Sequence, residues 1–152
     1  MTVMASSEKI VSRTRQIAAP AATIFDLLAN PSRHAEIDGS DMVQAARPTG
    51  PERLSLGAKF GMDMKFAGFM PYRISNEVVE FVENERIAWR HFGHHIWRYE
   101  LEAIDDATTN VTESFEWGTA RFPPIYEWVG YPKKHEGNIE ATLARLDEVV
   151  TG

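Results

Sequence analysis

Hydrophobic and polar residues alternate most regularly between positions 59 and 66 of the chain. The apolar positions of this run are Phe60, Met62, Met64 and Phe66, and polar or small residues separate them. Successive side chains of a β-strand point to opposite faces of the sheet, so a period of two predicts a strand with one apolar face. Two methionines beside two phenylalanines make that face soft and adaptable.

Further strand-like runs, rich in β-branched and aromatic residues, lie on both sides of this segment. They span residues 8–17, 72–82, 86–92, 95–103 and 109–117. The spacers between the last four runs have two to five residues and include Gly, Asn or Asp, which is typical of hairpin connections. The pattern predicts an antiparallel meander, and residues 42–56 are expected to form an edge strand and a loop.

Two short helices are predicted after the first strand. Pro20 suits a first helical turn, and the apolar stripe that follows it consists of Ile24, Leu27 and Leu28. Asn30 stands before a proline, where it can end this helix and cap the next one.

A longer helix is predicted at the end of the chain. Apolar residues spaced by three or four, Ile139 and Leu143 among them, predict an amphipathic helix over residues 132–150. A second helical segment is expected before it, over residues 123–129. Strands in the middle and helices at both ends indicate an α+β architecture, an antiparallel sheet with helices on one side.

The strand periodicity also predicts which side chains share the inner face of this sheet. Besides the run that begins at position 59, the inner positions are Ile87, Trp89, His91, Trp97, Tyr99, Leu101, Val111, Glu113, Phe115 and Trp117. Most charged residues of these strands fall on the opposite face. A β-bulge within residues 72–82 would exchange the two faces in part of that run, because both of its faces hold apolar residues.

The composition is that of one ordinary domain. The chain has 152 residues, of which 43% are hydrophobic and 25% charged, enough to bury a sizeable core. We expect a single domain over residues 8–152 after a flexible start, residues 1–7. The absence of cysteine excludes disulfides, thiolate metal sites and a cysteine nucleophile.

Charge and motifs exclude several classes of function. The net charge of −6 argues against nucleic acid as a partner, because such binding needs a concentrated basic face. The chain shows no signal-like start and no apolar stretch long enough for stable membrane insertion, so a cytoplasmic location is expected. The common hydrolase, metalloprotease and nucleotide-binding motifs are absent, and no cofactor is expected.

Several segments carry a resemblance to a known family. They are APAATIFDLLANPSRHAEIDGS at residues 19–40, LGAKFGMDM at 56–64, PYRIS at 71–75, RIAWRHFG at 86–93, WRYEL at 97–101 and NIEATLARL at 138–146. With the order of elements, they resemble the START/Bet v 1-like superfamily, also called SRPBCC. The similarity is to its small actinobacterial members of the polyketide cyclase/dehydrase or lipid-transport type.

This resemblance implies a helix-grip fold, in which a curved seven-stranded antiparallel sheet wraps a long C-terminal helix. It further implies an apolar cavity between sheet and helix that binds a small hydrophobic or amphipathic molecule, such as a lipid, a fatty acid or a polyketide. The residues expected to line it are Phe60, Met62, Met64, Phe66, Trp89, His91, Trp97, Tyr99, Glu113, Phe115, Trp117, Ile139 and Leu143.

An inward carboxylate is the unusual feature of this set, because a buried acid must find a partner or become neutral. Glu113 is expected to pair with His91, with Tyr99 or with an arginine at the cavity mouth, or to orient a polar atom of the ligand. The alternative function is a cyclase, aromatase or dehydratase that uses these groups for proton transfer.

The histidines give only weak evidence for a metal site. His91, His94 and His95 stand close together, yet the strand pattern places them on different sides of a turn, so no metal site is expected. His34 is predicted to be a surface residue of its short helix, and His135 to lie on one face of the last helix.

The segment RFPPIYEWVGY, residues 121–131, is rich in aromatic side chains. It could form a lid over the cavity or a contact between two copies of the chain, since exposed aromatic clusters mark interaction sites. A third interpretation therefore stays open: the protein could be an interaction module whose cavity is collapsed. A homodimer is one assembly that such a module could form.

Overall fold

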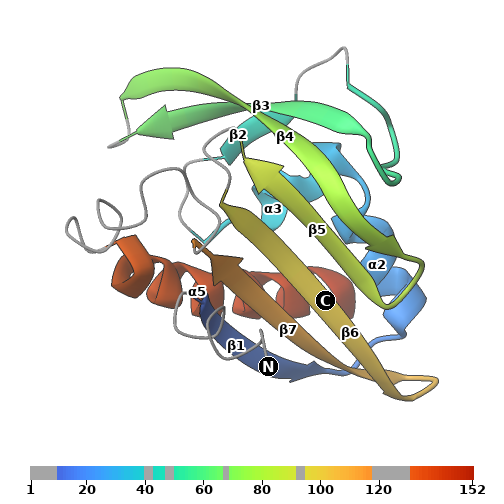
Figure 1. The fold of residues 1–152 in the computed structure, drawn as a ribbon. Coiled ribbons are helices and arrows are strands. Elements are labelled where there is room, and N and C mark those ends of the chain that lie inside the picture. Colours follow the sequence, from blue (N-terminus) through green and yellow to red (C-terminus); the bar gives the residue numbers. More distant parts are fainter. Residues whose placement is uncertain (1–9, 40–42, 47–49, 67–68, 92–94, 118–130) are drawn as a thin grey trace, which may run out of the picture.

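Seven antiparallel strands form one curved sheet in the order β1-β7-β6-β5-β4-β3-β2 (Figure 1). This computed structural model describes residues 10–39, 43–46, 50–66, 69–91, 95–117 and 131–152, and of Phe66 and residues 131–136 only the backbone. Helix α5 crosses one face of the sheet, which we call the inner face (Figure 1). The predicted α+β helix-grip architecture is confirmed.

The elements lie close to their predicted positions. The strands are β1 (Ile10–Ile17), β2 (Val43–Ala46), β3 (Lys59–Phe66), β4 (Met70–Val82), β5 (Arg86–His91), β6 (Ile96–Asp105) and β7 (Thr108–Glu116). The helices are α2 (Ala21–Leu28), the short 3-10 helix η1 (Pro31–Arg33), α3 (His34–Ile37) and α5 (Tyr131–Thr151). The predicted segments 1–7 and 123–129 lie outside the described residues, as does 121–131 apart from the backbone of Tyr131.

The predicted cap of the second helix is present. The Asn30 side chain accepts a hydrogen bond from the Ser32 backbone amide at 3.1 Å, and Pro31 occupies the first turn of η1. This arrangement satisfies an amide that a helix start leaves without a partner in the helix. It also turns the chain sharply between α2 and α3.

Cross-strand pairing confirms the predicted inner face. Directly opposite residues of an antiparallel pair point to the same face of the sheet. Trp89 lies opposite Trp97, Trp97 lies opposite Phe115, and Tyr99 lies opposite Glu113. These side chains from β5, β6 and β7 therefore form one continuous surface beneath α5.

A bulge is found in β4, within the run where the sequence left one open. Val78 lies opposite Trp89, whereas Glu80 lies opposite the next residue of β5, so β4 contains one extra residue at this point. Before the bulge the buried Val78 faces inward, and after it Phe81 packs against Phe25 of α2 with ring centroids 5.3 Å apart. The bulge moves the inner positions from even to odd numbers, which lets both apolar stretches of the strand be buried.

Helix α5 packs on the inner face through its apolar stripe. Ile139, Leu143 and Leu146 are buried, as the helical spacing predicted. At its rim, Arg13 and Arg15 of β1 form ion pairs with Glu140 and Asp147 of α5, with N–O distances of 2.9 and 2.8 Å. These exposed pairs add little stability, so burial of the apolar stripe holds the helix in place.

Close contact between the end of α3 and α5 depends on a glycine. The Gly39 amide donates a hydrogen bond to Thr142 Oγ1 at 2.8 Å, and Arg145 donates one to the Asp38 carbonyl. A Cβ atom at Gly39 would lie 2.6 Å from the Asn138 carbonyl oxygen, closer than packed atoms allow. Only glycine fits at this position without displacing α5.

Candidate functional site

The inner face of the sheet has a closed part and a more open part. Beside α2, the side chains of Ile17, Ile87 and Val111 are completely buried. Further along the same face, several aromatic and aliphatic side chains keep part of their surface exposed. These partly exposed residues are Tyr72, Ile74, Trp89, His91 and Trp97. Aromatic rings that stay partly exposed on an inner face are candidates for contact with a ligand.

A cluster of rings connects α3 to this face. The His34 ring stacks on Trp89 with centroids 4.9 Å apart, and Phe60 packs edge-on against both rings at 5.8 and 5.6 Å. Tyr99 continues the cluster, with its ring centroid 5.7 Å from that of Trp89. Edge-on and stacked arrangements of this kind are favourable beyond their buried area.

The prediction that His34 lies on the surface is wrong, because only 7% of the residue is exposed. Its Nε2 lies 2.8 Å from the Leu28 carbonyl oxygen, so Nε2 carries the hydrogen and donates it. Burial lowers the pKa of His34 to about 4, and the imidazole is therefore neutral near pH 7. Pro31, His34 and Ile37 are all buried. Their spacing of three residues is the pattern in the sequence that could have indicated a buried His34.

The inward carboxyl of Glu113 is bonded to Tyr99, one of the three partners proposed from the sequence. The Tyr99 hydroxyl donates to Glu113 Oε2 at 3.0 Å, and both residues are buried. Burial raises the pKa of both groups well above their usual range, and the negative charge of Asp38 acts in the same direction. The hydrogen bond from Tyr99 opposes this shift at Glu113 but does not cancel it, so burial favours the neutral, protonated form of Glu113.

Two buried polar atoms, one in β7 and one in the residue that follows it, have no hydrogen-bond partner among the described residues. They are Glu113 Oε1 and Trp117 Nε1, which lie on the same inner face on either side of Phe115. Native proteins satisfy most such atoms, and an exception needs an explanation. A ligand contact is one explanation.

His91 lies on the inner face as predicted, but it stacks on His95, with ring centroids 4.5 Å apart. Burial lowers the pKa of His91 to about 4, so this imidazole is neutral at physiological pH. Within the described part of the chain, no three His, Asp or Glu side chains are placed to hold a metal ion. His94 and the side chain of His135 are outside that part.

The structure places the predicted site residues at different depths. Partly exposed on the inner face are Trp89, His91 and Trp97. Buried in or beside the core are Phe60, Met62, Met64, Tyr99, Glu113, Phe115, Trp117, Ile139 and Leu143. The side chain of Phe66 is not among those described. That these predicted site residues bind a ligand stays a prediction.

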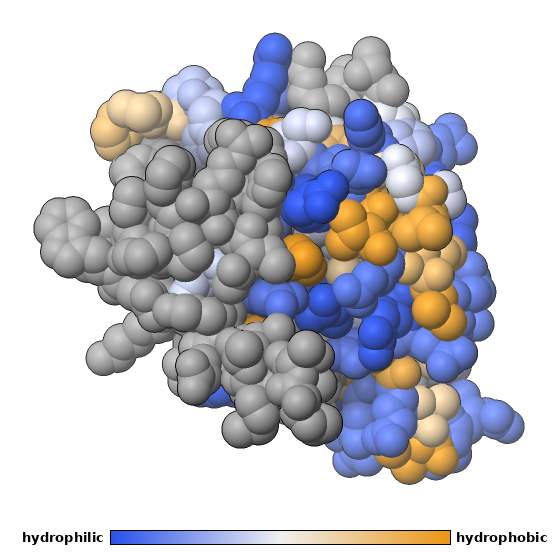
Figure 2. Space-filling view, viewed as in Figure 1, coloured by the Kyte–Doolittle hydropathy of each residue, from blue (hydrophilic) through white to orange (hydrophobic). Residues whose placement is uncertain are grey.

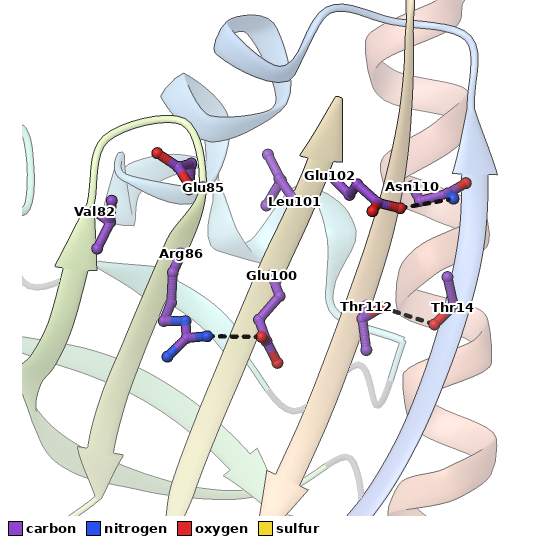
Figure 3. Close-up of a pocket in the computed structure, with 9 residues that line it drawn as sticks. All are labelled: Thr14, Val82, Glu85, Arg86, Glu100, Leu101, Glu102, Asn110 and Thr112. Atoms are coloured by element: carbon purple, nitrogen blue, oxygen red, sulfur yellow. Dashed lines mark hydrogen bonds and ion pairs between the residues drawn. The ribbon is translucent and has the colours of Figure 1, made fainter. Parts of the chain in front are cut away.

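A hollow of about 550 Å³ lies on the outer face of the sheet, away from α5 (Figure 3). Its polar side chains bond to one another, as Arg86 does to Glu100 at 3.0 Å and Thr14 to Thr112 at 2.7 Å. On this side of the molecule, hydrophilic side chains surround scattered apolar ones (Figure 2). The hollow therefore lacks the apolar lining that a hydrophobic ligand needs.

A second hollow, of about 680 Å³, opens where β2, β3 and β4 meet. Its lining includes Met64 and Tyr72, which lie opposite each other on the inner side of β3 and β4. Of the predicted site residues, Met64 is therefore the one that reaches this hollow.

None of the described helices is long and apolar enough to cross a membrane.

Residues 9–151 match the model of a family described as polyketide cyclase / dehydrase and lipid transport. The chain belongs to this family. The description joins reactions of polyketides with the transport of lipids, and both kinds of molecule are largely apolar. The family thus agrees with the resemblance seen in the sequence.

The uncharacterized protein Rv0088 of Mycobacterium tuberculosis is 39% identical to this chain, over 97% of the chain and 67% of its own length. Two solved structures share the fold at 16% identity. Protein NE0264 from Nitrosomonas europaea has a TM-score of 0.74 and covers 95% of this chain and 96% of its own. A START superfamily protein from Mycobacterium smegmatis has a TM-score of 0.72 and covers 93% and 97%.

The Aha1 dimer from Colwellia psychrerythraea has the same fold, with a TM-score of 0.66 and 14% identity, over 93% of this chain and 95% of its own. At such identities the likeness concerns the fold alone. This chain therefore shares its overall fold with these three structures.

Proposed function

We propose that the protein binds and carries a small hydrophobic or amphipathic molecule on the inner face of its sheet, beneath α5. The observation that carries this proposal is the partial exposure of Trp89 and Trp97 on a face whose other end is completely buried. Large aromatic surfaces left partly open beside a core provide binding energy for an apolar guest. The family description supports a lipid or a polyketide-like molecule.

The described structure is the closed form of such a carrier. Phe60, Met62 and Phe115 are buried in its core. Methionine side chains change conformation easily, so Met62 can give way when a guest enters. The proposal includes the cytoplasmic location expected from the sequence.

Native mass spectrometry of the purified protein, together with binding of the apolar fluorophore N-phenyl-1-naphthylamine, tests the proposal. Trp97→Ala is expected to weaken fluorophore binding. Ile104→Ser is the matched control, because Ile104 is half exposed at the end of β6 and its loss leaves the inner face intact. Absence of both a bound molecule and fluorophore affinity would refute the proposal.

A second candidate function is a cyclase or dehydratase acting on a polyketide-like substrate. It is favoured by the Tyr99 hydroxyl and the Glu113 carboxyl, which lie 3.0 Å apart in a buried site. A neutral acid beside a phenol can give a proton to a substrate oxygen and thereby assist dehydration.

The two candidates respond differently to Glu113→Gln. The carboxamide has the size and neutrality of the acid but cannot transfer its proton, so turnover would be lost while ligand binding is kept. A turnover rate unchanged by this substitution would remove Glu113 from any reaction.

A further inference from the structure

One carboxyl oxygen of Glu113 accepts a hydrogen bond, and the other has no partner among the described residues. Oε2 accepts the hydrogen bond from Tyr99, whereas the buried Oε1 has no hydrogen-bond partner in the part of the chain that the structure describes. Only 3% of the residue is exposed, so the carboxyl is shielded from bulk water. Leaving such a group unpaired is costly, which makes the position poorly suited to a purely structural role.

The charges around Glu113 come from three neighbouring elements. Asp38, at the end of α3, lies close enough for its negative charge to act on both Glu113 and Tyr99. Arg13 of β1 lies directly opposite Glu113, but its Nε donates to Glu140 of α5 at 2.9 Å. Of these charges, that of Asp38 acts on the pKa of Glu113, and a negative charge at this place disfavours an anionic ligand.

We propose that Glu113 Oε1 donates a hydrogen bond to a neutral carbonyl oxygen of the bound ligand. This inference rests on the proposed binding function and names the polar end of the ligand. A neutral carboxyl can accept at one oxygen, here from Tyr99, and donate from the other. The ligand class is then an apolar chain or ring that carries a ketone, ester or similar carbonyl, rather than a carboxylate.

The position of Glu113 beneath the aromatic cluster fits this role. Trp97 packs on Phe115 with ring centroids 4.7 Å apart, and Trp89 packs on Tyr99 at 5.7 Å. Both tryptophans are partly exposed, so part of each ring is accessible to a ligand. The ligand's apolar part would then lie against these rings, with its carbonyl directed at Glu113.

The test compares three probes with the same chain length: 2-nonanone, nonanoate and nonane. Their dissociation constants are measured by displacement of N-phenyl-1-naphthylamine. We expect the wild-type protein to bind the ketone about tenfold more tightly than the alkane, and more tightly than the carboxylate. In Glu113→Leu the ketone's advantage over the alkane should disappear. In Glu113→Gln it should persist, because the amide still donates.

Glu102→Leu is the control, since Glu102 is exposed and lines the outer hollow (Figure 3). It should leave all three affinities unchanged, and circular dichroism checks that each variant folds. If wild-type protein binds the alkane as well as the ketone, or the carboxylate more tightly, the carbonyl assignment is wrong and the binding function stands. If the wild type binds neither the fluorophore nor any probe, both proposals are wrong.

Discussion

The Tyr99 hydroxyl lies 3.0 Å from Glu113 Oε2, and the two residues face each other on neighbouring strands β6 and β7. Both are buried on the inner face of the sheet. This pair places a polar, uncharged group within a largely aromatic surface. Substitutions in this pair can therefore distinguish a binding role, a catalytic role and a purely structural role.

The stability of the protein should depend on pH through Glu113. Its pKa is raised in the folded state, mainly by burial. The folded state therefore holds a proton that the unfolded state has released, and stability is lost as pH rises through the folded pKa. Glu113→Gln should remove this loss and flatten the decline in the free energy of unfolding that begins as pH rises above 4.5, the ordinary pKa of the carboxyl. Urea unfolding at a series of pH values measures this free energy.

The matched control for that experiment is Glu102→Gln, because Glu102 is exposed on the outer face. Its pH profile should follow that of the wild type. A wild-type profile that matches the profile of Glu113→Gln would mean that the pKa of Glu113 is not raised in the folded state.

Acid should destabilise the protein through His34. Its pKa is about 4 in the folded state against 6.5 for a free imidazole, so stability present above pH 6.5 is lost as pH falls towards 4. This single group accounts for a loss on the order of 3 kcal/mol, since each pKa unit corresponds to about 1.4 kcal/mol. His34→Gln, which can still donate to the Leu28 carbonyl, should show a smaller loss in urea unfolding at acid pH.

Contact between α3 and α5 should be sensitive to one methyl group. Gly39→Ala would place a Cβ 2.6 Å from the Asn138 carbonyl oxygen, and overpacking of this kind costs about 1–3 kcal/mol. Gly137→Ala is the opposite case, because no described atom outside the neighbouring backbone of α5 lies within 4 Å of a Cβ at Gly137. It should stabilise the helix by about 0.5–1 kcal/mol. Thermal unfolding of both variants compares them directly, and equal effects would contradict the packing described.

Burial rather than ion pairing should hold the sheet against α5. Phe115 is completely buried and contacts Trp97, Trp117 and His95, so Phe115→Ala should cost about 3–5 kcal/mol. Arg15→Ala removes an exposed ion pair and should cost less than about 1 kcal/mol. Chemical denaturation distinguishes these values, and the reverse order would overturn this account of the core.

Local patterns in the sequence determined the elements and most of the inner face. The alternation at residues 59–66 fixes which side of β3 is apolar, because a strand has a period of two, and Phe60, Met62 and Met64 are indeed buried. The same rule places Trp97, Tyr99 and Phe115 on one face. The helix starts follow from Pro20 and Asn30, whose effects act on their own neighbours.

Tertiary structure alone decided the chemical state of the inner face. His34 is buried because Trp89, from a strand far along the chain, stacks on it. The neutral form of Glu113 is favoured because burial raises its pKa and the charge of Asp38 acts in the same direction. Desolvation and electrostatic interaction depend on which atoms surround a group in space, and the spacing of residues along the chain does not specify that environment.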